Sequence, residues 1–178
     1  QKKAFLDSLV KKRTLMISPT GSGKSLIIYC LVRYLLKCTE GKILVVVPTT
    51  NLVNQMRSDF EDYGSKDSFN ISDEIHTIFS GQEKQTDRRV VISTWQSLYT
   101  LPESYFDPFE SVFGDECHLF KAKSLSGLME KMKNAYYRFG TTGTLGDSKT
   151  HKLVIEGLFG PAVKVTSTTE LMKKKILA

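Results

Sequence analysis

With 178 residues, the chain is long enough for one domain with a substantial hydrophobic core and has room for little more. A hydrophobic content of 40% and a charged content of 25% place it among globular proteins. The net charge of +6 indicates a polyanionic partner, either nucleic acid or an anionic membrane surface. Much of this charge lies in short runs of lysine and arginine, which also occur as ordinary solvated faces, so charge alone supports nucleic acid only weakly.

Cysteine content and hydropathy exclude two further classes of protein. The three cysteines are too few and too scattered for a disulfide framework, which fits a reducing, cytoplasmic compartment. No apolar run approaches the roughly 18 residues of a membrane span, and the first residues lack the apolar segment of a signal peptide. We therefore expect a soluble cytoplasmic protein with no membrane partner. Because the chain begins abruptly, we also expect a fragment of a longer protein.

The first part of the chain alternates helical and extended patterns. Apolar residues at helical spacing predict a short helix over residues 1–10, and residues 13–17 predict a strand. Residues 24–37 are apolar nearly all round, which predicts a helix covered on two sides. Residues 42–47 form a β-branched run typical of parallel strands buried on both faces. A second helix follows, with Asn51 as its cap.

The remainder contains shorter strand candidates separated by polar segments. Residues 64–74 carry turn residues and are expected to form a loop. Further strands are predicted at residues 75–79, 90–93, 111–113, 136–140 and 163–165, and further helices at residues 125–132 and 168–175. Strands that alternate with helices predict right-handed crossovers and an open parallel sheet.

A glycine-rich stretch at residues 18–25 stands between the first predicted strand and the helix at 24–37. This order is the context that a phosphate-binding loop requires, because the turn directs backbone N–H groups inward and the helix start adds its positive dipole end. We expect Lys24 to reach the β- and γ-phosphates of a nucleotide and the Ser25 hydroxyl to ligate Mg²⁺. The strict pattern begins with glycine where this chain has Ser18, and an ordinary glycine-rich turn with a solvated lysine is the alternative. The candidate nucleotide-binding residues of the loop are Thr20, Gly21, Ser22, Gly23, Lys24 and Ser25.

An acidic tetrapeptide, Asp115-Glu116-Cys117-His118, follows the predicted strand at 111–113. The partner of a phosphate loop lies at the carboxyl end of a neighbouring strand in open α/β sheets. We expect Asp115 to hold Mg²⁺ and Glu116 to polarise an attacking water. His118 can carry a hydrogen bond from this site to the next element. A polar loop after a strand is the alternative, and the coincidence with Gly-Lys-Ser favours the site. No other histidine stands at metal-ligand spacing from Cys117 and His118.

In combination, these motifs resemble motifs I and II of superfamily-two helicases and translocases, the second being of the Asp-Glu-x-His type. Other stretches resemble further motifs in the expected order: residues 48–55 motif Ia, Ser80-Gly81 the short glycine motif, residues 93–98 the strand-end motif that meets nucleic acid, and residues 142–144 motif III. Within that superfamily, the chain is similar to phage branched-DNA helicases of the UvsW type.

The resemblance implies an α/β fold, a RecA-like P-loop domain whose mostly parallel central sheet carries helices on both faces. Residues 1–178 would form the first RecA-like domain, and a second such domain outside this chain would supply an arginine finger. ATP and Mg²⁺ are the implied cofactors, and DNA, contacted through its backbone, is the implied partner. Gln1 stands where these proteins read adenine. The other implied residues are Pro48, Thr49, Thr50, Gly81, Thr94, Trp95 and Gln96 for nucleic-acid contacts, and Thr142, Gly143 and Thr144 for coupling.

Several of these residues have simpler interpretations or depart from the family pattern. The threonines at strand ends can act as ordinary helix caps, and Trp95, the single tryptophan, can be a core residue instead of a base-stacking one. Gly114 replaces the usual apolar residue before motif II, and Gly143 replaces the usual alanine of motif III. The aromatic residue that often precedes the glutamine lies outside the chain.

We therefore expect the ATP-binding motor domain of an ATP-dependent DNA helicase or translocase that acts in recombination or repair, on branched DNA, and that hydrolyses ATP weakly in isolation. Two alternatives stay open. One is the motor subunit of an ATP-dependent restriction endonuclease, which would share these motifs. The other is a nucleotide-dependent nucleic-acid-binding module without productive hydrolysis.

Overall fold

The structure, a computed structural model, describes residues 2–19, 21–65, 69–79, 81–143 and 149–166. Within these ranges, seven strands form one sheet in the order β3-β4-β2-β5-β6-β1-β7, and every neighbouring pair is parallel. The predicted parallel sheet is thereby confirmed. The strands are β1 (Arg13–Ile17), β2 (Lys42–Val47), β3 (Ile75–Ile78), β4 (Val90–Thr94), β5 (Phe109–Gly114), β6 (Tyr137–Thr142) and β7 (Ala162–Lys164).

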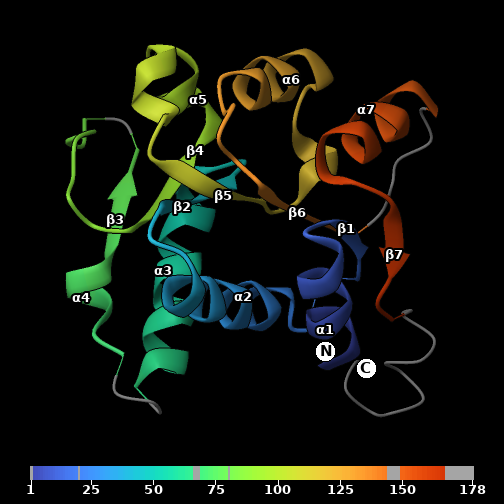
Figure 1. The fold of residues 1–178 in the computed structure, drawn as a ribbon, viewed down its shortest axis with the longest axis horizontal. Coiled ribbons are helices and arrows are strands. Elements are labelled where there is room, and N and C mark those ends of the chain that lie inside the picture. The colour runs from blue at the N-terminus through green and yellow to red at the C-terminus, as the bar shows by residue number, and fades with distance from the viewer. Residues whose placement is uncertain (1, 20, 66–68, 80, 144–148, 167–178) are drawn as a thin grey trace.

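Helices cover both faces of the sheet (Figure 1). One layer holds α1, α2 and α3, and the opposite layer holds α5, α6 and α7, so the domain has three layers. The helices are α1 (Lys2–Lys11), α2 (Lys24–Cys38), α3 (Thr50–Gly64), α4 (Ile71–Glu74), α5 (Trp95–Tyr99), α6 (Ala122–Glu130) and α7 (Lys149–Phe159). Among the described residues, none of them is long and apolar enough to cross a membrane.

Strand β2 shows why the central strands have no polar face. Its side chains alternate between the two hydrophobic clusters, with Ile43 and Val45 against the α2 layer and Leu44 and Val46 against the α6 layer. All four are at most 2% exposed. A strand covered by helices on both faces needs apolar residues at every position, which accounts for the uninterrupted β-branched run.

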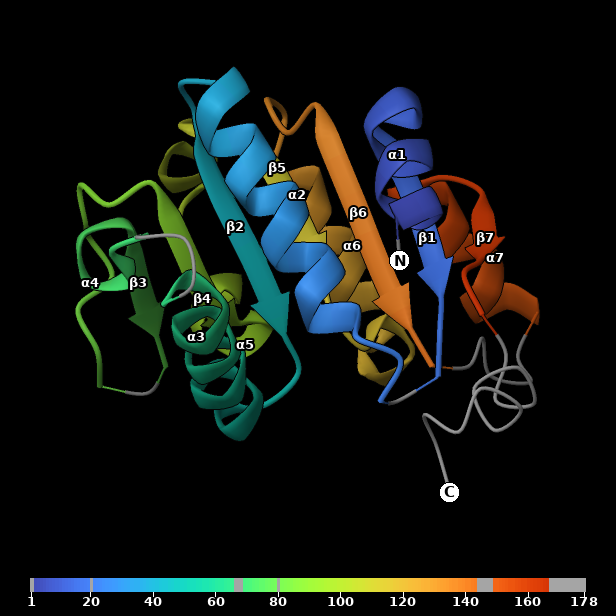
Figure 2. The same cartoon turned by 90° about the horizontal axis from the view of Figure 1, so that it is seen from below.

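The parallel arrangement brings the strand ends that carry the motifs to one edge of the sheet. Figure 2 shows the arrowheads of β2, β6 and β1 at the same edge. Ile17 of β1 pairs with Thr142 of β6, and Gly114 of β5 pairs with Gly140 of β6. The segments that follow β1, β5 and β6 are therefore neighbours, although they lie far apart in the sequence. This placement creates the site described below.

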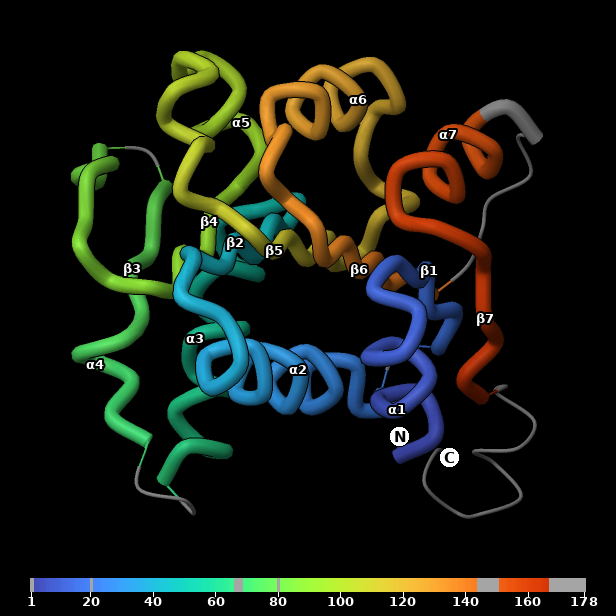
Figure 3. The backbone as a smooth tube through the Cα atoms, viewed as in Figure 1, coloured from blue at the N-terminus to red at the C-terminus, as the bar shows by residue number. Residues whose placement is uncertain are grey.

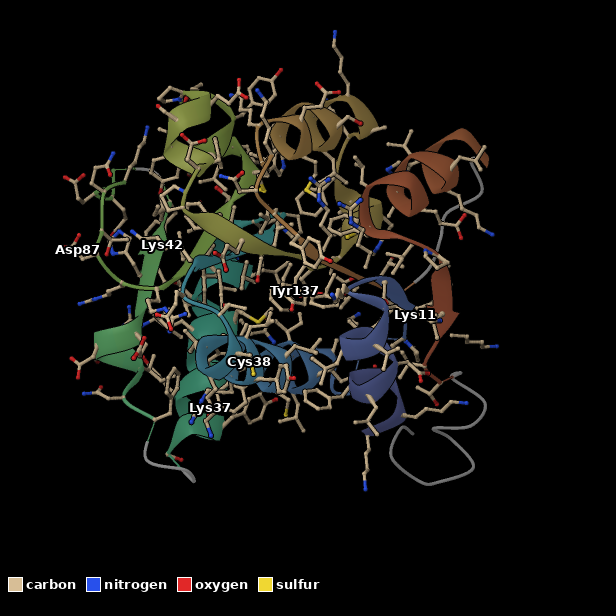
Figure 4. All side chains as sticks on the ribbon, viewed as in Figure 1. Lys11, Lys37, Cys38, Lys42, Asp87 and Tyr137 are labelled. Atoms are coloured by element: carbon tan, nitrogen blue, oxygen red, sulfur yellow. The ribbon has the colours of Figure 1, made fainter. Side chains whose placement is uncertain are left out.

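The opposite edge of the sheet carries the strand starts. Figure 4 labels Lys42 and Tyr137 there, the first residues of β2 and β6, together with Cys38 at the end of α2. Helix α1 lies beside α2 and near β1, and the tube in Figure 3 shows β7 on the far side of β1. Neither α1 nor β7 contributes a described residue to the site.

Two local predictions are wrong, two helices were not predicted, and one predicted helix is not tested. Thr49, and not Asn51, caps α3, because its hydroxyl accepts the Leu52 N–H at 3.4 Å. The expected loop at 64–74 contains α4, whose Asn70 cap accepts the Ser72 N–H. Helices α5 and α7 were not predicted, since α5 has only five residues and α7 has a glycine in its last turns. The helix predicted at 168–175 lies outside the described residues.

Candidate active site

The loop between β1 and α2 has the backbone that its glycines predict. Gly21 and Gly23 have φ values of 77° and 83°, in the left-handed region that favours glycine, and Gly23 immediately precedes α2. The loop is tied at its start, because the Ser18 N–H donates to the Thr142 carbonyl at 2.9 Å and the Ser18 hydroxyl donates to Ser22 Oγ at 2.6 Å. Serine at the position of the usual glycine thus holds the loop through its side chain.

The side chains of Lys24 and Glu116 meet beside this loop. Nζ of Lys24 lies 2.5 Å from Oε1 of Glu116, and the two side chains are only 9% and 16% exposed. Glu116 has φ 49° and ψ 49°, a left-handed conformation that costs about 1–2 kcal/mol for a residue other than glycine. Strain of this kind persists where surrounding contacts fix the residue, and such residues cluster at functional sites. The structure therefore joins the two predicted halves of the site.

Asp115 is a buried carboxylate at the end of β5. Its Oδ1 accepts hydrogen bonds from the Thr141 hydroxyl and from the Glu116 N–H, the latter at 2.9 Å, while its own N–H donates to the Val46 carbonyl. Burial raises the pKa of Asp115 because it disfavours the ionised form, and the hydrogen bond from Thr141 opposes that shift. A cation beside this carboxylate would stabilise its charged form.

These groups line one cleft of about 360 Å³ between the loop and α3. Ser25 and Asp115 present a hydroxyl and a carboxylate to it, the oxygen ligands that Mg²⁺ prefers, beside the ammonium of Lys24. Among the described residues, no group of three or more His, Cys, Asp or Glu side chains could hold a metal ion. This donor set fits Mg²⁺ bound by one or two protein ligands together with phosphate oxygens, as is usual for nucleotide sites.

His118 connects the segment after β5 to the end of β6. Its Nδ1 lies 2.9 Å from Oγ1 of Thr142 and 3.4 Å from Oε2 of Glu116. Thr142 is fully buried, so this link passes through the interior of the site. A change at Glu116 can therefore reach the segment after β6 through one imidazole ring.

Of the two glycines that depart from the family pattern, packing requires the first but not the second. A Cβ on Gly114 would lie 2.7 Å from the Phe159 ring and 2.9 Å from Cys117 Sγ, so no larger side chain fits there. A Cβ on Gly143 would lie 3.9 Å from both Lys24 Nζ and Glu116 Oε2, which is ordinary van der Waals contact. The usual alanine would fit at Gly143, and its absence leaves space beside the ion pair.

The candidate nucleic-acid residues lie along the carboxyl edge of β2, β3 and β4. Gln96 Nε2 donates to the Pro48 carbonyl at 3.4 Å, so the structure joins two of these segments. A hollow of about 310 Å³ lies beside them, lined by Phe79, Gly81, Lys84, Gln96, Ser97 and Thr100. Gly81 has φ 82° and an added Cβ would meet nothing within 4 Å.

Two of the three candidate threonines of this edge, and the tryptophan, have structural partners. Thr49 caps α3, Thr94 Oγ1 lies 2.9 Å from Ser97 Oγ, and Thr50 is exposed. Trp95 is half-buried against the α6 layer, with its ring edge-to-face on Tyr99. Capping and core packing therefore account for these contacts, and nucleic-acid binding by these residues stays a prediction. Gln1, Thr20 and Thr144 lie outside the described residues, as does Ser80.

Sequence analysis missed one wall of the cleft. Helix α3 lines it with Leu52, Gln55, Met56, Asp59 and Tyr63. These positions recur at three- and four-residue spacing, which places them on one helix face. Leu52, Met56 and Tyr63 are typical of a hydrophobic helix face, and the polar Gln55 and Asp59 on the same face are the signal that this face meets a cleft.

Comparison with known proteins gives the family. A family model described as "Type III restriction enzyme, res subunit" (ResIII) matches residues 1–147. The chain belongs to this family. The ResIII chain is 38% identical over 173 residues to the ATP-dependent DNA helicase uvsW of Enterobacteria phage T4. That alignment covers 97% of this chain and 34% of the relative, so the chain spans about a third of that protein's length.

Solved structures agree with the ResIII assignment. A crystal structure of the UvsW helicase from bacteriophage T4 matches with a TM-score of 0.83 at 38% identity, covering 92% of this chain and 58% of that one. The Pyrococcus furiosus Hef helicase domain matches with a TM-score of 0.76 at 18% identity, over 93% and 38% of the two chains, and this likeness shows the fold alone. The predicted fold, a RecA-like α/β domain with a parallel central sheet and helices on both faces, is confirmed.

Proposed function

We propose that this chain is the ATP-binding motor domain of an ATP-dependent DNA helicase or translocase. The observation that carries the proposal is the contact of Lys24 with Glu116, which brings two motifs 92 positions apart into one cleft beside Ser25 and Asp115. A lysine, a hydroxyl and two carboxylates around a glycine-rich helix start are the parts that phosphoryl transfer to water requires.

Each side chain has a defined task in this proposal. Lys24 leaves Glu116 to bind the β- and γ-phosphates of ATP, and Glu116, released from that ion pair, orients a water and accepts its proton. Ser25 and Asp115 would hold Mg²⁺, which when bound would neutralise charge that develops on the phosphates. His118 contacts both Glu116 and Thr142, so a movement of Glu116 shifts the imidazole ring and, through it, Thr142.

We propose that DNA binds along the carboxyl edge of β2, β3 and β4 through backbone contacts, which carry no sequence information. The similarity to a protein named an ATP-dependent DNA helicase supports DNA as the partner, and the net charge of +6 is compatible with it. We extend this to a role in DNA recombination or repair on branched DNA. The small number of scattered cysteines fits a reducing cytoplasm, which would be that of a host cell if the protein is of phage origin.

We further propose that residues 1–178 work as the first of two RecA-like domains, with ATP between them. The second domain would supply an arginine finger, which can raise the rate of phosphoryl transfer by several orders of magnitude. The chain alone should therefore bind ATP and hydrolyse it slowly. Strong DNA-stimulated turnover by this chain alone would contradict the pairing.

A second candidate has a specific observation in its favour. The matching family model is named after the res subunit of type III restriction enzymes, so the same motor could drive a restriction endonuclease. Both candidates require ATP hydrolysis by the same residues. A nuclease domain elsewhere in the natural protein would decide for the restriction enzyme.

The experiment that tests hydrolysis uses Glu116→Gln, which keeps the size of the side chain and removes the base. We expect ATP turnover to fall by at least about a hundredfold, the usual contribution of a general base, while ATP binding persists. Unchanged turnover would favour a nucleotide-dependent binding module over a motor. Glu61→Gln, on the exposed surface of α3, is the matched control and should leave turnover unchanged.

A further inference from the structure

A tyrosine outside the family motifs contacts the candidate magnesium ligand. The hydroxyl of Tyr63, in the last turn of α3, lies 3.1 Å from Oγ of Ser25, in the first turn of α2. The two helices lie side by side on the same face of the sheet (Figure 1). Tyr63 and Ser25 also line the same cleft as Lys24 and Asp115. The hydrogen bond therefore lies at the wall of that cleft, at the oxygen that would meet the metal.

The ring of Tyr63 is held in place by an aromatic cluster. Its centroid lies 5.4 Å from that of Tyr29, which in turn packs edge-to-face on Phe60 at 5.3 Å and on Phe69 at 6.2 Å. Arg33 lies 4.0 Å over the Phe69 ring. Aromatic packing and a cation over a ring both favour one arrangement, so the Tyr63 hydroxyl has a fixed position relative to Ser25.

The chemistry of a serine ligand requires such a partner. A hydroxyl has one hydrogen and two lone pairs. When a lone pair of Ser25 points to a cation, its hydrogen must point away from the cation, and that hydrogen needs an acceptor if the group is half-buried. The phenolic oxygen of Tyr63 is at hydrogen-bond distance to accept it.

We propose that Tyr63 is a positioning residue for Mg²⁺: it accepts the Ser25 O–H and so directs a Ser25 lone pair toward the metal that accompanies ATP. This inference rests on the proposed function. Tyr63 touches neither metal nor phosphate and acts only through Ser25. In the opposite polarity, Tyr63 would donate to a Ser25 lone pair and compete with the metal for it. Removal of the Tyr63 hydroxyl would then strengthen Mg²⁺ binding instead of weakening it.

The test is the Mg²⁺ dependence of ATP binding to Tyr63→Phe, which keeps the ring and removes the acceptor. A fluorescent, non-hydrolysable ATP analogue is titrated in EDTA and at a series of Mg²⁺ concentrations. We expect the Mg²⁺ concentration at half-saturation to rise about fivefold, the loss of one net hydrogen bond, with no change of affinity in EDTA. An unchanged half-saturation would overturn the inference, and so would a lowered one.

Two further variants separate positioning from packing. Tyr29→Phe also removes a hydroxyl from the aromatic cluster. That hydroxyl accepts a hydrogen bond from Arg33 and not from Ser25, so the Mg²⁺ dependence should stay unchanged. In Ser25→Ala, the added change Tyr63→Phe should have no further effect on Mg²⁺ half-saturation, because the bond it removes is already gone. An equal effect of Tyr63→Phe with and without Ser25 would contradict the inference. A wild-type protein whose ATP binding ignores Mg²⁺ would instead contradict the proposed function.

Discussion

The ammonium of Lys24 and the carboxylate of Glu116 form a largely buried ion pair, 2.5 Å apart, at the position where a terminal phosphate would bind. The pair satisfies two charges that would otherwise be costly to bury. In the proposed function, ATP would take Lys24 away from Glu116, so nucleotide binding would also release the proposed catalytic base. Under that proposal, hydrolysis would be held back until a phosphate replaces the carboxylate as the partner of Lys24.

The first prediction concerns the stability of the nucleotide-free protein. Lys24→Ala leaves the Glu116 carboxylate without its partner, and we expect the free energy of unfolding to fall by about 1–2 kcal/mol, between the values for exposed and fully buried pairs. Urea unfolding measures it. Arg57→Ala removes a far more exposed pair, with Glu61, and should change stability by at most about 0.5 kcal/mol. Equal effects of the two variants would show that burial of the first pair is unimportant.

The second prediction concerns the glycine before motif II. Gly114→Ala places a methyl group 2.7 Å from the Phe159 ring, and we expect a loss of about 1–3 kcal/mol, as for other overpacked cores. Adding Phe159→Leu should recover part of that loss, because the smaller side chain makes room. Gly157→Ala in α7, where the added Cβ meets nothing within 4 Å, should stabilise by about 0.5–1 kcal/mol. Thermal unfolding of the four proteins decides it, and a neutral Gly114→Ala would contradict the packing.

The third prediction concerns pH. Burial raises the pKa of Asp115 in the folded state, so its ionisation at neutral pH lowers stability. This loss of stability shrinks as the pH falls through the raised pKa of the folded state, and it is gone once the pH is below the ordinary pKa of an aspartate. Asp115→Asn keeps the Oδ1 acceptor for Thr141 and should therefore unfold at a higher temperature than the wild type at pH 7 without Mg²⁺. The difference should vanish at low pH, and a variant that is less stable at pH 7 would refute the assignment.

The fourth prediction concerns thiol reactivity. Burial strongly raises the pKa of the Cys117 thiol, which is fully buried and donates to the Gly114 carbonyl at 3.1 Å. Cys30 and Cys38 are exposed. Alkylation of the native protein at pH 8, followed by mass spectrometry, should label Cys30 and Cys38, and Cys117 only after unfolding. Comparable labelling of Cys117 in the native protein would mean that the segment after β5 opens readily.

Much of the site could be predicted because its residues are strongly marked in the sequence. Lys24 follows a glycine turn after a strand, and Asp115 follows another strand, so the rule for parallel sheets places both at one edge. The partners that hold these residues carry no such mark. Thr141 is one more residue of a strand, and Tyr63 fits the apolar face of a helix, so only the packing of α3 against α2 shows its hydroxyl at Ser25.

The same limit applies to the fold. The strand candidates were recognisable because buried parallel strands are uniformly apolar, whereas α7 has Gly157 near its end and was not predicted. The reason for Gly114 could not be found without α7, because it depends on where the Phe159 ring packs. The departure at Gly114 is thus explained by Phe159, a residue distant in the sequence whose ring occupies the space that a side chain would need.

Equilibrium binding of a fluorescent ATP analogue to the wild type and to Lys24→Ala, with Mg²⁺ present, tests the central claim most directly. The claim predicts that the wild type binds and that the variant binds at least about tenfold more weakly, since Lys24 makes charge-assisted hydrogen bonds to phosphate. Equal binding by the two proteins would show that the nucleotide does not occupy the cleft that Lys24 shares with Asp115 and Glu116, and would contradict the account.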